Sequence, residues 1–136
     1  MKIRICILLL MLGLTASCFR KPDMNQPHVI LADKFAHALA EGRFADAHSL
    51  FTEDQKKKQP EAELKKEYEE MISYGPGPAT HIEVMQALDV WPEKQKDDIG
   101  WVYVAIAGDN YSEAVAVVVA RTSAGMAIRY IELGRP

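Results

Sequence analysis

The hydrophobic residues of this chain change their spacing once, at Gly75, Pro76, Gly77 and Pro78. Before this segment, apolar residues recur every three or four positions, which is the pattern of an amphipathic α-helix. After it, apolar residues alternate with others, as they do in a β-strand that shows every second side chain on one face. Because the two patterns do not mix, the sequence predicts an α+β fold, with helices first and an antiparallel sheet after them.

Three helices are expected before the change of spacing. The first begins at Pro27 and ends before Gly42, because proline suits the first turn of a helix and glycine the position just after its end. The second covers about residues 43–51, and the polar residues 52–59 are expected to break the helical region. Pro60 then opens a third helix, whose apolar stripe consists of Leu64, Tyr68, Met71 and Ile72.

Four strands are expected after the change, at about residues 82–91, 101–107, 111–121 and 126–133. The middle two form a hairpin that turns at Asp109 and Asn110, so the alternation of side chains assigns its faces. One face carries Val102, Val104, Ile106, Val115, Val117 and Val119, and the other carries Trp101, Tyr103, Ala105, Ala107, Ala114 and Ala116. In the first strand, the same alternation groups Ile82, Val84, Leu88 and Val90. Both hairpin faces are apolar, and both should therefore be largely covered.

Residues 1–17 have the composition of a bacterial signal peptide: a positive start, an apolar run and a small-residue end. The step from these small residues to Cys18 resembles a lipobox, at which the cysteine is acylated before cleavage. It departs from that pattern at one place, because Leu14 lies four residues before Cys18 and Thr15 takes the usual leucine position. We expect lipidation of Cys18, and ordinary cleavage after Ser17 remains the alternative.

The expected organisation is a signal peptide at 1–17, a lipidated N-terminus and flexible tether at 18–27, and a single domain at 28–136. The cysteines are Cys6 and Cys18, so the domain contains no internal disulfide. The formal net charge of −3 becomes more negative when the leader with Lys2 and Arg4 is removed, which opposes binding to nucleic acid. We expect an exported, membrane-anchored lipoprotein of the cell envelope, with a soluble periplasmic or secreted protein as the alternative.

The helical region and the last strand resemble the nuclear-transport-factor-2-like, or cystatin-like, superfamily, and more narrowly its exported bacterial domains of unknown function. The resemblance rests on residues 32–36, 42–47, 50–52 and 128–132. It implies a cone-like domain in which the N-terminal helices pack in the concave face of a curved antiparallel sheet of about four strands. It also implies that a pocket is often present at the open end, although the superfamily includes enzymes, binding modules and immunity proteins alike.

The sequence gives little support for catalysis or for a cofactor. Asp33 and His37 lie four residues apart on the first helix, but they are expected to be solvated, and no metal is assigned. Enzymes of the resembled superfamily tend to use an acid or base inside the cone. The candidates for that role here are Asp89, Tyr103, Tyr130 and Glu132, and nothing in the sequence brings them together.

Arg129 is the one charged residue on an apolar strand face. Alternation within residues 126–133 groups it with Ala127, Ile131 and Leu133, opposite Met126, Ile128 and Tyr130. A guanidinium is costly to bury unpaired, so it has to reach water, a carboxylate or an anionic ligand. It either extends to solvent over small side chains or lies beside Trp101 and Tyr103, where it would hold the acidic group of a ligand or partner.

Three functions are compatible with these observations. The favoured one is a non-catalytic, membrane-tethered binding or interaction domain whose partner is a protein or a small acidic ligand. The second is an immunity protein that neutralises a toxin. The third is a small isomerase or hydrolase that uses the cone pocket. The oligomeric state is not determined by any of these patterns.

Overall fold

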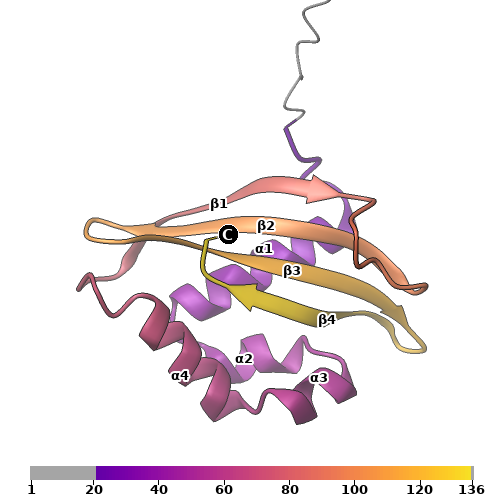
Figure 1. Cartoon of the computed structure of the whole chain (residues 1–136), viewed down its shortest axis with the longest axis horizontal. Coiled ribbons are helices and arrows are strands. Elements are labelled where there is room, and N and C mark those ends of the chain that lie inside the picture. Colours follow the sequence, from indigo (N-terminus) through magenta and orange to yellow (C-terminus); the bar gives the residue numbers. More distant parts are fainter. Residues whose placement is uncertain (1–20, 136) are drawn as a thin grey trace, which may run out of the picture.

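A computed structural model of the chain describes residues 21–135, so the predicted signal peptide and Cys18 lie outside the described part. The described chain begins with the helices α1 (Pro27–Ala40), α2 (Phe44–Ser49), α3 (Glu53–Lys58) and α4 (Glu61–Met71). The strands β1 (Ala79–Leu88), β2 (Asp98–Gly108), β3 (Ser112–Thr122) and β4 (Gly125–Leu133) follow. Helices precede strands throughout this range, which confirms the predicted α+β class (Figure 1). No helix within residues 21–135 is long and apolar enough to cross a membrane.

The strands form one antiparallel sheet in the order β1-β2-β3-β4. The hairpin between β2 and β3 has the predicted register, with Val102 opposite Val117 and Val104 opposite Val115. On the other face, Tyr103 lies opposite Ala116 and Ala105 opposite Ala114. Both predicted faces of the hairpin are therefore confirmed.

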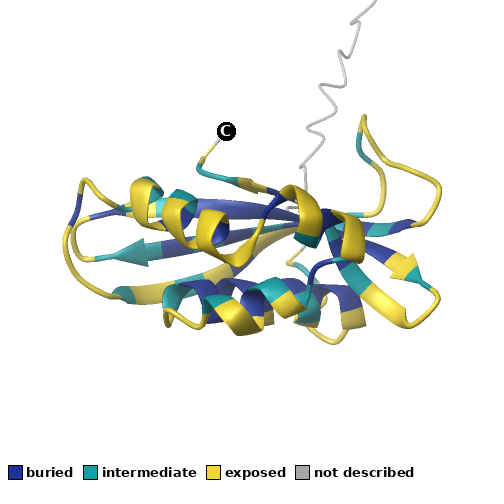
Figure 2. Ribbon diagram, turned by 90° about the horizontal axis from the view of Figure 1, so that it is seen from below, coloured by how far each residue is buried: buried dark blue, intermediate teal, exposed yellow. Residues whose placement is uncertain are grey.

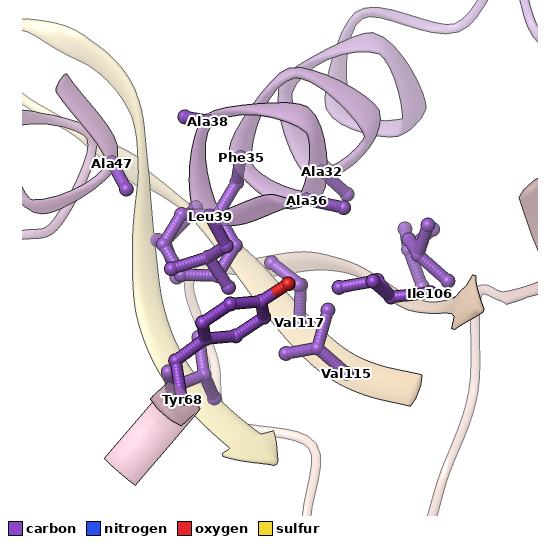
Figure 3. Packing of buried hydrophobic residues seen from close by; sticks show 14 of the residues in the cluster. Ala32, Phe35, Ala36, Ala38, Leu39, Ala47, Tyr68, Ile106, Val115 and Val117 are labelled. Carbon is purple, nitrogen blue, oxygen red and sulfur yellow. The ribbon is translucent and has the colours of Figure 1, made fainter. Parts of the chain in front are cut away.

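The core lies between α1 and one face of the curved sheet, where α1 passes behind the strands in the view of Figure 1. Phe35 and Leu39 point from α1 toward Val115 and Val117, and the ring of Tyr68 enters this cluster from α4 (Figure 3). The spacing of the apolar residues on α1 and α4 explains this arrangement, because it places them on the covered side of each helix. Exposed residues gather on the outer sides of the helices and in the loops (Figure 2).

The start of α1 packs closely against the sheet. His28 is only 5% exposed, and its ring lies over Gly100 of β2. A methyl group added at Gly100 would lie 2.5 Å from Cδ2 of His28, so the imidazole ring or α1 would have to move to make room for it. The glycine therefore makes room for the imidazole ring and lets α1 approach the sheet.

Two local predictions are wrong. Residues 52–59 were expected to break the helical region, but they contain α3, because the side chain of Thr52 accepts a hydrogen bond from the backbone of Gln55 and caps a new helix. Strand β1 ends at Leu88 rather than at 91, and its register with β2 shifts between Val84 and Gln86. This bulge moves Leu88 to the face of Trp101, away from the face of Val84.

Candidate functional site

A groove of about 1070 Å³ lies at the end of the sheet where β2 begins and β3 ends. One wall is formed by α3 and the residues on either side of it, and the opposite wall by residues 95–98 and the β3–β4 turn. We call it the α3 groove. A short parallel bridge between Phe51 and Ile128 ties the α2–α3 connection to the edge of β4, so α3 stands beside the sheet. The groove is thus made by elements that are distant in sequence.

Two bulges in the sheet place opposite charges across this end of β3. In β2, Asp98 lies opposite Ala120 and Gly100 opposite Val119, so Ile99 is an extra residue. In β4, the partners of Val118 and Val119 are Tyr130 and Ile128, so Arg129 is an extra residue there. Bulges of this kind redirect side chains and are frequent next to functional sites.

The redirected side chains of Arg129 and Asp98 meet in a forked ion pair. Nε of Arg129 donates to Oδ1 of Asp98 at 2.6 Å, and Nη2 donates to Oδ2 at 2.7 Å. The Asp98 side chain is fully buried, whereas that of Arg129 is 27% exposed. Both residues line the α3 groove. Two parallel hydrogen bonds fix the plane of the guanidinium as well as its position.

The carboxyl group of Asp98 is held in its ionised form. Burial alone would raise its pKa, but hydrogen bonds from Arg129 and from the backbone N–H of Gln95 outweigh this effect, and the pKa is lowered. Both oxygens of Asp98 therefore accept hydrogen bonds, with two on Oδ2. Such a carboxylate is an anchor for Arg129, and it is a poor general base because its lowered pKa makes it a weak acceptor of protons.

The outer edge of the Arg129 guanidinium remains available. A guanidinium has five N–H donors, and within residues 21–135 Arg129 donates only to the two oxygens of Asp98. The groove also contains two large, exposed apolar side chains, Met126 at 39% and Tyr130 at 47% exposure. The arrangement offers a fixed, forked cationic donor beside an apolar surface.

Other charged residues of the groove come in both signs. Lys56 pairs with Glu53 at 3.0 Å, and Gln59 donates to Glu67, which joins α3 to α4. Gln55 in turn donates to Gln59 at 3.1 Å, and both amide side chains are almost fully buried. Because acids and bases are mixed along the walls, a ligand would be selected by the placement of single groups and not by a uniform field.

The residues predicted to form a binding site are not brought together as a unit. Trp101 and Tyr103 stack on each other with centroids 5.8 Å apart, on the sheet face away from the helices. They do not line the α3 groove, whereas Arg129 does. The predicted grouping of Arg129 with Ile131 and opposite Ile128 is wrong, because the bulge lets both isoleucines enter the core. Cys18, the predicted lipidation site, lies outside the described residues.

The other sequence candidates are scattered. Of the four groups considered for catalysis, only Tyr130 lines the groove, whereas Asp89 follows the end of β1 and Glu132 is exposed. Asp33 and His37 face each other at 3.6 Å on the surface of α1. Within residues 21–135, no group of three or more His, Cys, Asp or Glu side chains is arranged to hold a metal ion.

Sequence reasoning missed Asp98 and two buried glutamines, Gln55 in α3 and Gln59 just after its end. Asp98 lies between the predicted strands at 82–91 and 101–107, where an aspartate is expected to be solvated. One signal could have identified Asp98. Arg129 lies on an apolar strand and requires a partner, and Asp98 comes just before the apolar residues 101–107 of the central hairpin. The chain matches no family model, no curated protein and no solved structure.

Proposed function

We propose that this chain is a non-catalytic binding domain, and that its α3 groove holds the acidic group of a ligand or partner at Arg129. The observation that carries the proposal is the guanidinium of Arg129, fixed on one edge by the buried Asp98 and free on the other. A carboxylate is planar and fits this free edge with two hydrogen bonds. The fixed geometry also means that little side-chain entropy is lost on binding.

The groove favours acids that carry an apolar group. Met126 and Tyr130 line it with a large part of each side chain exposed, so they can cover a small hydrocarbon or aromatic group next to the carboxylate. The engaged oxygens of Asp98 support binding over catalysis, because the one buried carboxylate of the groove is already committed to Arg129.

The test is a thermal-shift screen of the full-length chain with small apolar acids such as benzoate and hexanoate, compared with their neutral amides. We expect the acids to raise the melting temperature of the wild type and to have no effect on Arg129→Ala. Arg129→Lys should not restore the effect, because lysine lacks the fork. Arg121→Ala removes another arginine of the same groove and is the matched control. Stabilisation by the amides, or an equal loss in Arg121→Ala, would contradict the proposal.

We also propose that the domain acts at a membrane surface of the cell envelope, tethered through a lipid on Cys18. The leader and the small residues before Cys18 support this. Labelling with a radioactive fatty acid should mark the wild type and leave Cys18→Ser unmarked. Absence of label from both proteins would leave the binding domain as a soluble exported protein.

A further inference from the structure

The outer edge of β1 is the open edge of the sheet. β1 is the terminal strand of the sheet, and within residues 21–135 its backbone bonds only to β2. The strand Ala79–Leu88 contains neither proline nor lysine, two residues that commonly protect such edges. Register shifts occur between Ala79 and His81 and between Val84 and Gln86, so the regular part of the edge is His81–Val84.

The polar side chains on this regular part are arranged symmetrically about Ile82. His81 and Glu83 lie on either side of it, on the same face of the strand, with 2.8 Å between Nε2 and Oε2. Both side chains are exposed, at 58% and 49%. Ile82 itself is half-buried on the other face. These two polar side chains could therefore pair with those of another strand without any change in the core.

We propose that two copies of this chain associate through their β1 edges, as an antiparallel pair with its twofold axis at Ile82. In an antiparallel pair, two opposed residues either exchange backbone hydrogen bonds or both direct their backbone N–H and C=O groups away from the other strand. These directions alternate along a strand. When a strand pairs with its own copy, the numbers of two opposed residues must therefore differ by an even number. The register about Ile82 places His81 of each copy opposite Glu83 of the other. Each imidazole then lies opposite a carboxylate with which it can share a hydrogen bond, so the register is self-complementary, as an interface with twofold symmetry must be.

The neighbouring registers are less favourable. An axis at Glu83 opposes the carboxylate to its own copy, and like charges directly opposite each other destabilise a sheet. An axis at His81 opposes the two imidazoles and leaves Glu83 without a partner on the other strand. Because the bulges limit the regular edge to His81–Val84, no longer pairing competes with the register about Ile82. The contact is short, which places it among small, reversible interfaces below about 1,200 Å².

Cysteine cross-linking of the full-length chain tests this register. In a Cys6→Ser/Cys18→Ser background, Ile82→Cys faces its own copy across the axis and should form a disulfide-linked dimer on mild oxidation. Thr80→Cys is the control, because residue 80 lies opposite residue 84 in this register. We expect Glu83→Arg, added to Ile82→Cys, to lower the yield of dimer roughly tenfold, since two cross-strand imidazole–carboxylate pairs are lost. The exchanged variant His81→Glu/Glu83→Arg should restore it.

Hydrogen exchange of the wild-type chain provides a second measurement that needs no substitution in the edge. Amides of residues 81–84 that face away from β2 should become more protected as protein concentration rises, and those of β3 should not change. Equal cross-linking at positions 80 and 82, a yield insensitive to Glu83→Arg, or exchange independent of concentration would overturn the proposal.

Discussion

Arg129 and Asp98 reach each other across β3, above Ala120, and join β4 to β2 through two hydrogen bonds of 2.6 and 2.7 Å. Neither strand is a neighbour of the other in the sheet. The pair therefore acts as a brace over the end of the sheet as well as the proposed anion site. Its two roles are separable, because they use different edges of the same guanidinium.

Removal of one partner should cost more stability than removal of both. Arg129→Ala leaves the fully buried carboxylate of Asp98 without its counter-charge, and we expect a loss of roughly 3 kcal/mol in the free energy of unfolding. The double variant Asp98→Leu/Arg129→Met replaces the pair by apolar groups and should be closer to the wild type. Urea denaturation measures both. A double variant as unstable as the single one would contradict the explanation that the loss in Arg129→Ala comes from the unpaired carboxylate of Asp98.

Ala120 should tolerate no larger side chain. It is 4% exposed and lies in register between Asp98 and Ala127, where Arg129 has to cross β3. We expect Ala120→Leu to cost about 1–3 kcal/mol and to displace the ion pair. Ala107→Leu, at a less buried site on the same face, is the matched control. If Ala120→Leu loses both stability and carboxylate binding while Ala107→Leu keeps both, the link between the bulge geometry and the site is supported. If both variants behave alike, it is contradicted.

Gly100 should be needed for the docking of α1. Its Cβ would lie 2.7 Å from Nε2 of His28, so Gly100→Ala should push the start of α1 away from β2 and destabilise the fold by about 1–3 kcal/mol. The double variant His28→Ala/Gly100→Ala removes the clashing ring and should recover part of this loss. If it does not, the strain arises from the strand itself and not from the imidazole.

His28 should make stability depend on pH in the weakly acidic range. Burial lowers its pKa below the usual 6.5, although the charge of Asp89 opposes this. As pH falls through about 6.5, the unfolded chain takes up a proton before the folded chain does, so stability is full above this value and decreases below it. His28→Gln should reduce the slope of unfolding free energy against pH between 7 and 5. His81→Gln, at an exposed position, is the control, and an equal change in both variants would contradict the assignment.

The sequence by itself determined the order of helices and strands and the two faces of the central hairpin. It could do so because the alternation of Val102, Val104 and Ile106 is local and is continued by the valines of β3. The helical spacing of Leu64 and Tyr68 likewise identified the covered side of α4. Such patterns depend only on the geometry of one element and on which residues avoid water.

Only the tertiary structure decided the site. A bulge adds one residue to a strand and reverses the faces of all residues beyond it. The spacing of apolar residues in the sequence does not predict where a bulge occurs. For this reason alternation misplaced Arg129 and Leu88. The pairing of Arg129 with Asp98 depends on two such bulges in strands that are not neighbours. The groove depends further on α3, which reaches the edge of β4 through the contact of Phe51 with Ile128. These are long-range consequences of packing, and they have no counterpart in the spacing of residues along the chain.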